Sequence, residues 1–449
     1  MKEIAIIGGN ISGITTTFLL QDEYDPSEVI LLEKKPIRST TPPMYAVMAA
    51  SILEKMLNQF GIDSAIEPFI YDLTQIHDVE GKAVLEFQTP LSIVDLPSFR
   101  EKFSCIIDTN YIVDRAEVIS YREVNEQKRK LSVRNQHIDI IETNNIIDAS
   151  GFDWFYTKEA MRIEEYIPFK HNFFTFYQAI IETSRIPIER EALHISFNEY
   201  ATPGGFSILF STNSDRLWVL GFYNKFLTHK TPIESVNTVK NALGIVGRVS
   251  QIRSKEIFLG RPLLQISPQN NIFLVGASNL SVYPVLVSGA IYNIFTTQEV
   301  VKFLLKLLDS QRTPKEISFE LNSYYTKTLF PISEIFDAFR VLLLTVRREI
   351  LEDFITLSLE ILETIFRSPP TDIGIELIQM LIRLISSPKV SKKILTILRS
   401  VYELLEAFKS KSDEDTDSWM PFVRLFSTKY SKQVTQLVPI SLAKEFHLD

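Results

Sequence analysis

The sequence predicts a mixed α/β fold in three parts, and three patterns along the chain support this. An apolar run, a glycine-rich turn and a stretch with helical spacing follow one another at the start of the chain. Aromatic and β-branched runs separated by turn residues fill its middle, and from Ile332 onward apolar residues recur with helical periodicity. We therefore expect an α/β domain, an inserted antiparallel sheet and a C-terminal helical region, together an α+β arrangement.

The glycine-rich turn joins a strand predicted at Ile4–Ile7 to a helix predicted at Ile14–Leu20. Gly8 and Gly13 take the first and last positions of a G-x-G-x-x-G pattern, and Asn10 stands at its central glycine. Between a strand and a helix, this pattern predicts the dinucleotide-binding turn of a Rossmann-like domain. The first glycine allows a tight turn, and the last lets the helix pack closely on the strand.

A second strand, Val29–Leu32, ends in Glu33. Its distance from the glycine turn is the one at which such a domain places the acid that binds a ribose hydroxyl. Helices are predicted at Ala46–Phe60, where Gly61 stops the pattern, and at Leu96–Asp108.

The same domain is expected to resume later in the chain. A third apolar strand lies at Asn144–Ala149, and a fourth, Ile272–Val275, is followed by a helix at Ala290–Leu308. We assign residues 1–160 and 255–310 to this discontinuous domain.

The segment 161–254 is expected to form an antiparallel sheet inserted between these two pieces, with part of 61–100 as a candidate addition. Residues 311–449 are expected to form a helical domain, because their apolar residues recur at helical spacing. The strand-like runs of the insert are Phe173–Ile181, Leu193–Phe197, Gly205–Ser211 and Arg216–Tyr223.

Composition excludes several classes of protein. With 449 residues, 45% hydrophobic and 23% charged, the chain can bury a full core. A formal charge of −8 disfavours nucleic-acid binding. The single cysteine and the lack of an evident export signal favour a cytoplasmic protein. The six histidines show no ligand spacing, so we expect no metal site.

Taken in order, the motifs resemble the FAD-dependent geranylgeranyl reductase family, flavoproteins of the archaeal type that are related to aromatic hydroxylases. Its mid-chain Asp-Ala-x-Gly is matched at Asp148–Gly151, and its Pro-Gly-Gly-aromatic turn at Pro203–Phe206, followed by Phe210. Its distal strand and turn are matched at Phe273–Ser278, and the start of the following helix at Gly289. The resemblance extends from residue 1 to about residue 300.

The resemblance implies FAD bound between the Rossmann-like domain and the inserted sheet, and reduction of double bonds in an isoprenoid or other long apolar substrate. It implies an electron donor and, for a lipid substrate, contact with the inner face of a membrane, but it assigns no catalytic acid. The cofactor-binding residues it implies are Gly8, Gly9, Asn10, Ser12, Gly13, Glu33, Lys34, Asp148, Gly151, Gly276, Ala277 and Gly289. The implied substrate pocket consists of Tyr45, Phe173, Phe206, Phe210 and Trp218, although aromatic residues in strands more often form core.

Three departures from the family pattern leave a second interpretation open. Asn10 replaces the glycine at which the backbone approaches the diphosphate, Ala277 replaces an acid, and Val287 replaces a glycine. These changes favour a homologue that binds FAD weakly or not at all, and that acts as a lipid-binding or partner-binding subunit.

Overall fold

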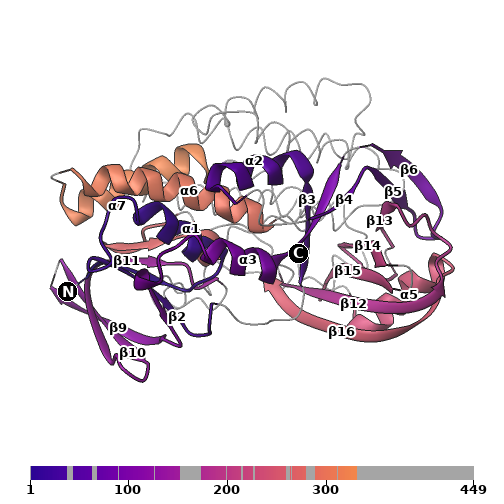
Figure 1. Cartoon of the computed structure of the whole chain (residues 1–449), viewed down its shortest axis with the longest axis horizontal. Coiled ribbons are helices and arrows are strands. Elements are labelled where there is room, and N and C mark those ends of the chain that lie inside the picture. Colours follow the sequence, from indigo (N-terminus) through magenta and orange to yellow (C-terminus); the bar gives the residue numbers. More distant parts are fainter. Residues whose placement is uncertain are drawn as a thin grey trace, which may run out of the picture.

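The structure of the protein is a computed structural model, and its described residues form three β-sheets with helices around them (Figure 1). The predicted helical region beyond residue 330 and Val287 lie outside the described residues. The described ranges are 2–37, 44–62, 68–88, 90–125, 127–151, 173–198, 200–213, 216–225, 228–258, 263, 265–279, 289–310 and 312–330.

The first sheet has a parallel centre and an antiparallel extension. Its strand order is β8-β2-β1-β11-β10-β9, and β17 pairs in parallel with β11. Every residue of β2 is buried, as expected for a parallel strand that is covered on both faces. The strands are β1 (Lys2–Ile7), β2 (Val29–Glu33), β8 (Ile112–Asp114), β9 (Glu117–Asn125), β10 (Lys128–Arg134), β11 (Ile140–Asp148) and β17 (Ile272–Leu274).

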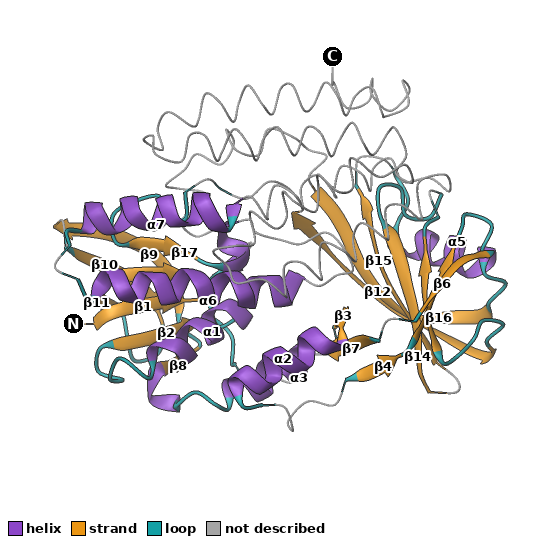
Figure 2. Ribbon diagram, turned by 90° about the horizontal axis from the view of Figure 1, so that it is seen from above, coloured by secondary structure: helices purple, strands orange, loops and turns teal. Residues whose placement is uncertain are grey.

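Alternate residues of the central strands enter two different core clusters. Ile4 and Ile6 of β1 pack in a large cluster that includes residues of the three helices beside this sheet, whereas Ala5 and Ile7 belong to a cluster on the opposite face. Figure 2 shows these helices lying along one face of the sheet. They are α1 (Ile11–Leu20), α6 (Gly289–Leu308) and α7 (Pro314–Thr328).

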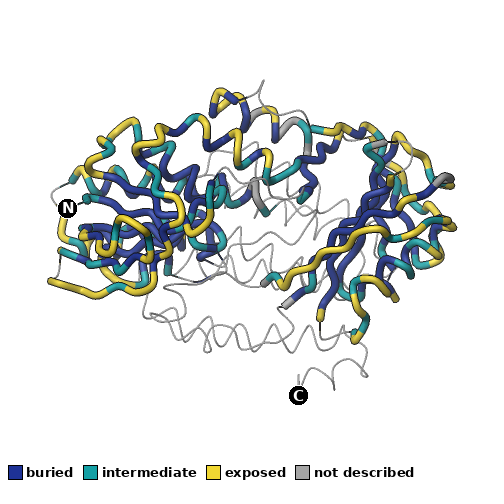
Figure 3. The backbone as a smooth tube through the Cα atoms, turned by 60° about the horizontal axis from the view of Figure 1, so that its bottom comes forward, coloured by how far each residue is buried: buried dark blue, intermediate teal, exposed yellow. Residues whose placement is uncertain are grey.

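The second sheet lies at the opposite end of the molecule (Figure 2), with strand order β16-β12-β15-β14-β13-β5-β6. Helix α5 (Pro232–Ala242) packs against one face through Val236 and Val239, and the strand interiors are buried (Figure 3). The other face shares the large cluster with the helices of the first sheet. The strands are β5 (Leu73–His77), β6 (Ala83–Phe87), β12 (Phe173–Arg185), β13 (Ala192–Ser196), β14 (Phe206–Asn213), β15 (Arg216–Asn224) and β16 (Val246–Phe258).

Between the two large sheets lie a small antiparallel sheet and two helices (Figure 2). The strands of the small sheet are β3 (Tyr45–Ala49), β4 (Phe69–Tyr71) and β7 (Leu91–Asp95), in the order β3-β7-β4. The helices are α2 (Ala50–Phe60) and α3 (Leu96–Ser104), and a short 3-10 helix, η2 (Thr109–Tyr111), follows α3 in the chain.

The structure confirms the predicted fold class and corrects several local predictions. Residues 46–49, predicted as helix, form a strand because they pair with β7, and the helix begins at Ala50. Helix α3 ends at Ser104 rather than Asp108. The insert is not wholly antiparallel, since β13 pairs in parallel with β5. Within the described residues, no helix is long and apolar enough to cross a membrane.

Two histidines that are far apart in the sequence meet where β5 and β13 pair. His77 Nε2 and His194 Nδ1 are 2.9 Å apart, and His194 Nε2 donates to the carbonyl oxygen of Glu189 at 2.6 Å. Both residues are buried. Burial lowers the pKa of His194 to about 4, and it also lowers the pKa of His77.

This pair predicts a stability that falls with acidification. Below the ordinary pKa of about 6.5, the unfolded chain binds protons that the folded pair does not, so stability present above this pH is lost as the pH falls toward 4. We expect a loss on the order of 3 kcal/mol from His194, measured by urea unfolding between pH 7 and pH 4.

The control for this prediction is His194→Gln, which keeps a polar side chain without the titration. Its unfolding free energy should depend less on pH than that of the unmodified chain. Equal pH dependence in the two proteins would contradict the assignment.

Candidate functional site

The glycine turn holds α1 directly against the end of β1. A Cβ atom at Gly13 would lie 1.8 Å from the carbonyl oxygen of Gly8, which no side chain can accommodate. Gly13 is therefore required for the close packing of helix on strand that the sequence pattern predicts. This packing aims the N-terminus of α1 at the space beyond the turn.

Asn10 occupies that N-terminus with its own side chain. Its Oδ1 accepts hydrogen bonds from the backbone N–H groups of Ser12 at 2.9 Å and Gly13 at 3.2 Å. Its Nδ2 donates to the carbonyl oxygen of Ala149, at the end of β11, at 2.5 Å. The N–H groups that would bind an anion at this helix end are thus capped by the residue that replaces the central glycine.

Glu33 lies beside the turn at the end of β2. Its Oε2 accepts from the backbone N–H of Gly9 at 2.5 Å, and its Oε1 accepts from that of Lys35 at 2.8 Å. The residue is 8% exposed, whereas the neighbouring Lys34 is exposed. The carboxylate is therefore fixed at the sheet edge, at the position predicted for binding a ribose.

Arg100 of α3 also reaches this turn, although no motif in the sequence indicates it. Its Nε donates to the carbonyl oxygen of Gly9 at 2.6 Å, and its Nη2 lies 3.8 Å from Oε2 of Glu33. The site thus contains a cation next to the helix N-terminus. In the sequence, Arg100 is simply an arginine within a predicted helix, and its contact with the turn depends on how that helix packs in the fold.

Asp148 joins the end of β11 to the turn that follows β17. Its Oδ1 accepts from the backbone N–H of Ser150 at 2.8 Å and from Oγ of Ser278 at 3.2 Å. The same Ser278 Oγ accepts from the N–H of Gly151 at 2.8 Å. Asp148 is fully buried, so these contacts make it a structural link between two loops of the site.

Gly276 lies at the start of the short helix η6 (Gly276–Asn279), where the chain turns with a φ of +61°. A Cβ atom at this position would be 2.0 Å from Oγ of Ser12 and 3.7 Å from Cβ of Asn293. The turn after β17 therefore lies directly against α1 and α6. Ala277 is half-buried in this turn, and half-buried Gly289 begins α6.

The cofactor-binding residues implied by the resemblance are therefore gathered mainly around the ends of β1, β2, β11 and β17. The predicted pocket aromatics form a second group. Tyr45 contacts Phe210 and Trp218 edge-on, with ring centroids 5.3 and 4.8 Å apart. Phe206 packs on Phe222 at 4.6 Å. These residues are buried and pack as an aromatic core between β3 and the second sheet, while Phe173 begins β12.

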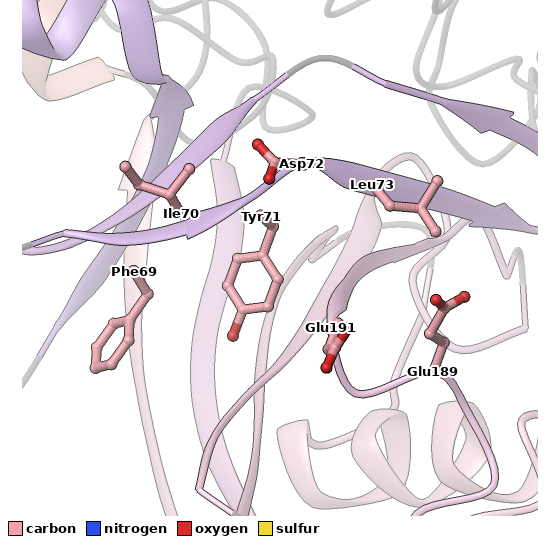
Figure 4. A pocket seen from close by; sticks show the side chains of 7 residues that line it. All are labelled: Phe69, Ile70, Tyr71, Asp72, Leu73, Glu189 and Glu191. Atoms are coloured by element: carbon pink, nitrogen blue, oxygen red, sulfur yellow. The ribbon is translucent and has the colours of Figure 1, made fainter.

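A cavity of about 400 Å³ opens elsewhere, where β4 leads into β5 (Figure 4). Its lining combines apolar residues and carboxylates, and none of the predicted site residues contributes to it. The lining residues are Phe69–Leu73, Glu189 and Glu191.

Known proteins resemble this chain in fold but very little in sequence. No protein-family model and no curated protein sequence matches the chain. Solved structures do match. A geranylgeranyl bacteriochlorophyll reductase-like protein from Thermoplasma acidophilum has a TM-score of 0.59 at 13% identity, covering 90% of this chain and 98% of that one.

Two further structures have a TM-score of 0.57. PqsL from Pseudomonas aeruginosa, described as a probable FAD-dependent monooxygenase, is 12% identical over 77% of this chain and 97% of its own. The flavin-dependent brominase Bmp2, as a triple mutant, is 11% identical over 80% of this chain and 93% of its own. The chain therefore has the Rossmann-like flavoprotein fold that these proteins share, as the resemblance to geranylgeranyl reductases implied.

Proposed function

We propose that the protein binds FAD where α1, η6 and α6 meet, and that it is an FAD-dependent oxidoreductase. The observation that carries this proposal is the arrangement around the glycine turn. The N-terminus of α1, the carboxylate of Glu33 and the guanidinium of Arg100 lie together at the ends of β1 and β2.

This donor set fits the adenosine diphosphate half of FAD. Glu33 offers carboxylate oxygens to ribose hydroxyls, and the helix end together with Arg100 offers positive potential to a diphosphate. A buried hydroxyl next to the turn also lacks a partner: Ser150 Oγ has no hydrogen bond to any described residue, and Cα of Ser150 lies 2.8 Å from the Cβ position of Gly8. Such an orphaned group is expected where a polar ligand completes a site.

FAD, when bound, supplies the hydride transfer. The residues of this chain would fix the adenosine half and orient the molecule toward the second sheet. The family resemblance suggests an isoprenoid or other apolar substrate, and it would lie near the aromatic residues Tyr45, Phe210 and Trp218, which pack on one another between β3 and the second sheet. Such a substrate would bring the protein to a membrane surface, and the reaction would require an electron donor.

One contact favours a second function. Because the Asn10 amide already satisfies the N–H groups of Ser12 and Gly13, the diphosphate must compete with an internal ligand. If the Asn10 amide keeps these hydrogen bonds in the presence of FAD, the protein would retain the fold without a flavin and act as a lipid-binding or partner-binding protein.

Titration with FAD distinguishes the two functions. Binding can be followed by the change in flavin fluorescence upon adding the purified full-length protein. We expect saturable binding that ADP competes away, because the proposed contacts are to the adenosine half. Fluorescence that does not change at any protein concentration would support the flavin-free function.

Asn10→Gly should bind FAD more tightly than the unmodified chain, by about tenfold, because it removes the competing amide and lets the backbone approach the diphosphate. The same variant should lose on the order of 1 kcal/mol of stability without FAD, because it removes both the N-cap and the hydrogen bond from Asn10 Nδ2 to the carbonyl oxygen of Ala149. Dissociation constants and urea unfolding measure the two effects.

Asn10→Ser is the matched control, because its hydroxyl still caps α1. It should bind FAD about as weakly as the unmodified chain. Adding Ala277→Asp to Asn10→Gly should tighten binding further. Affinity that is unchanged or lower in this double variant would contradict the placement of both positions beside the cofactor.

A further inference from the structure

Helix α6 contains a buried polar atom that the fold leaves without a partner. Oδ1 of Asn293 is inaccessible to solvent and accepts no hydrogen bond from the described residues. A buried amide oxygen without a donor costs roughly 1–3 kcal/mol, and a bound ligand that donates a hydrogen bond is one way to offset this cost.

The surroundings of Asn293 indicate what could supply the donor. Its Cβ lies 3.7 Å from the Cβ position of Gly276, and Oγ of Ser12 lies 2.0 Å from that same position. The side chains of Ser12 from α1 and Asn293 from α6 thus approach each other at Gly276, which has no side chain to separate them. The meeting point is next to the N-terminus of α1, where the proposed diphosphate would bind.

The meeting point lies between η6, α1 and α6, which is the place proposed above for FAD. An amide oxygen accepts hydrogen bonds, and a serine hydroxyl both donates and accepts them, so the pair suits a chain of hydroxyl groups. In FAD the group next to the diphosphate, on the side of the flavin ring, is the ribityl chain, a polyol.

We propose that Asn293, with Ser12, binds the ribityl hydroxyls of the flavin. This inference rests on the proposed FAD-binding function. It also accounts for Ala277, whose methyl group cannot accept a hydrogen bond: the acceptor comes from α6 instead of the turn after β17.

The test uses Asn293→Leu, which has nearly the same shape and no hydrogen-bonding groups. Riboflavin contains the ribityl chain without the diphosphate, whereas ADP contains the diphosphate without the ribityl chain. We expect Asn293→Leu to weaken the binding of riboflavin and FAD about tenfold and to leave ADP binding unchanged. Asn293→Asp keeps the acceptor and should retain flavin binding.

Stability without ligand separates a binding role from a structural one. Because the Asn293 oxygen has no partner among the described residues, Asn293→Leu should leave the melting temperature of the flavin-free protein unchanged or raised. Thr297→Val is the matched control, since its Oγ1 is also buried and unpartnered among the described residues, one turn further along α6. This control should bind riboflavin as the unmodified chain does.

The possible outcomes are distinct. If the unmodified chain binds neither FAD nor ADP, the proposed function fails, and this inference fails with it. If it binds FAD and ADP but Asn293→Leu binds riboflavin and FAD equally well, only the role of Asn293 is overturned. Equal losses in Asn293→Leu and Thr297→Val, or a loss of ADP binding in Asn293→Leu, would show a general disturbance of α6 and would also overturn it.

Discussion

The close contact of α1 with the glycine turn is the constraint on which the rest of the site depends. Gly13 leaves no space for a side chain beneath the helix, and Gly276 leaves none between the turn after β17 and α1. Because these two residues lack Cβ atoms, the N-terminus of α1 can pack against the ends of β1 and β17, which are far apart in the sequence. With the helix held there, Glu33 and Arg100 contact Gly9 in the turn, and Asn293 lies beside Gly276.

That helix end has two ways to satisfy its free N–H groups. A bound anion would do so from outside, and Asn10 does so from within. The internal cap stabilises the empty fold, and it makes the same groups harder to reach for a ligand. Asn10 thus shifts the balance between stability and binding at a point where a glycine would favour binding alone.

The fold could be predicted from the sequence wherever the signal was local. The strand, glycine turn and helix at the start lie where the pattern placed them, because apolar runs and glycine positions report directly on backbone geometry. The helix predicted from Ala46 was misplaced at its start because pairing with β7, a distant strand, overrode the local helical pattern. The parallel pairing of β13 with β5 was missed for a similar reason: strand order is a long-range property.

The same distinction applies to the site. Spacing along the chain indicated Glu33 and the glycine turn, but Arg100 and Asn293 have no motif around them. The contact of Arg100 with the turn and the role proposed for Asn293 follow from where α3 and α6 pack. The meeting of His77 with His194 was also beyond sequence spacing, since the pairing of their strands creates it.

The visible absorption spectrum of the purified protein, incubated with FAD and then freed of excess, tests the central claim most directly. The account predicts flavin bands near ~450 nm that remain with the protein, because the residues around α1 form a flavin site. A protein that stays colourless would contradict it and would identify Asn10 as a permanent occupant of the helix end.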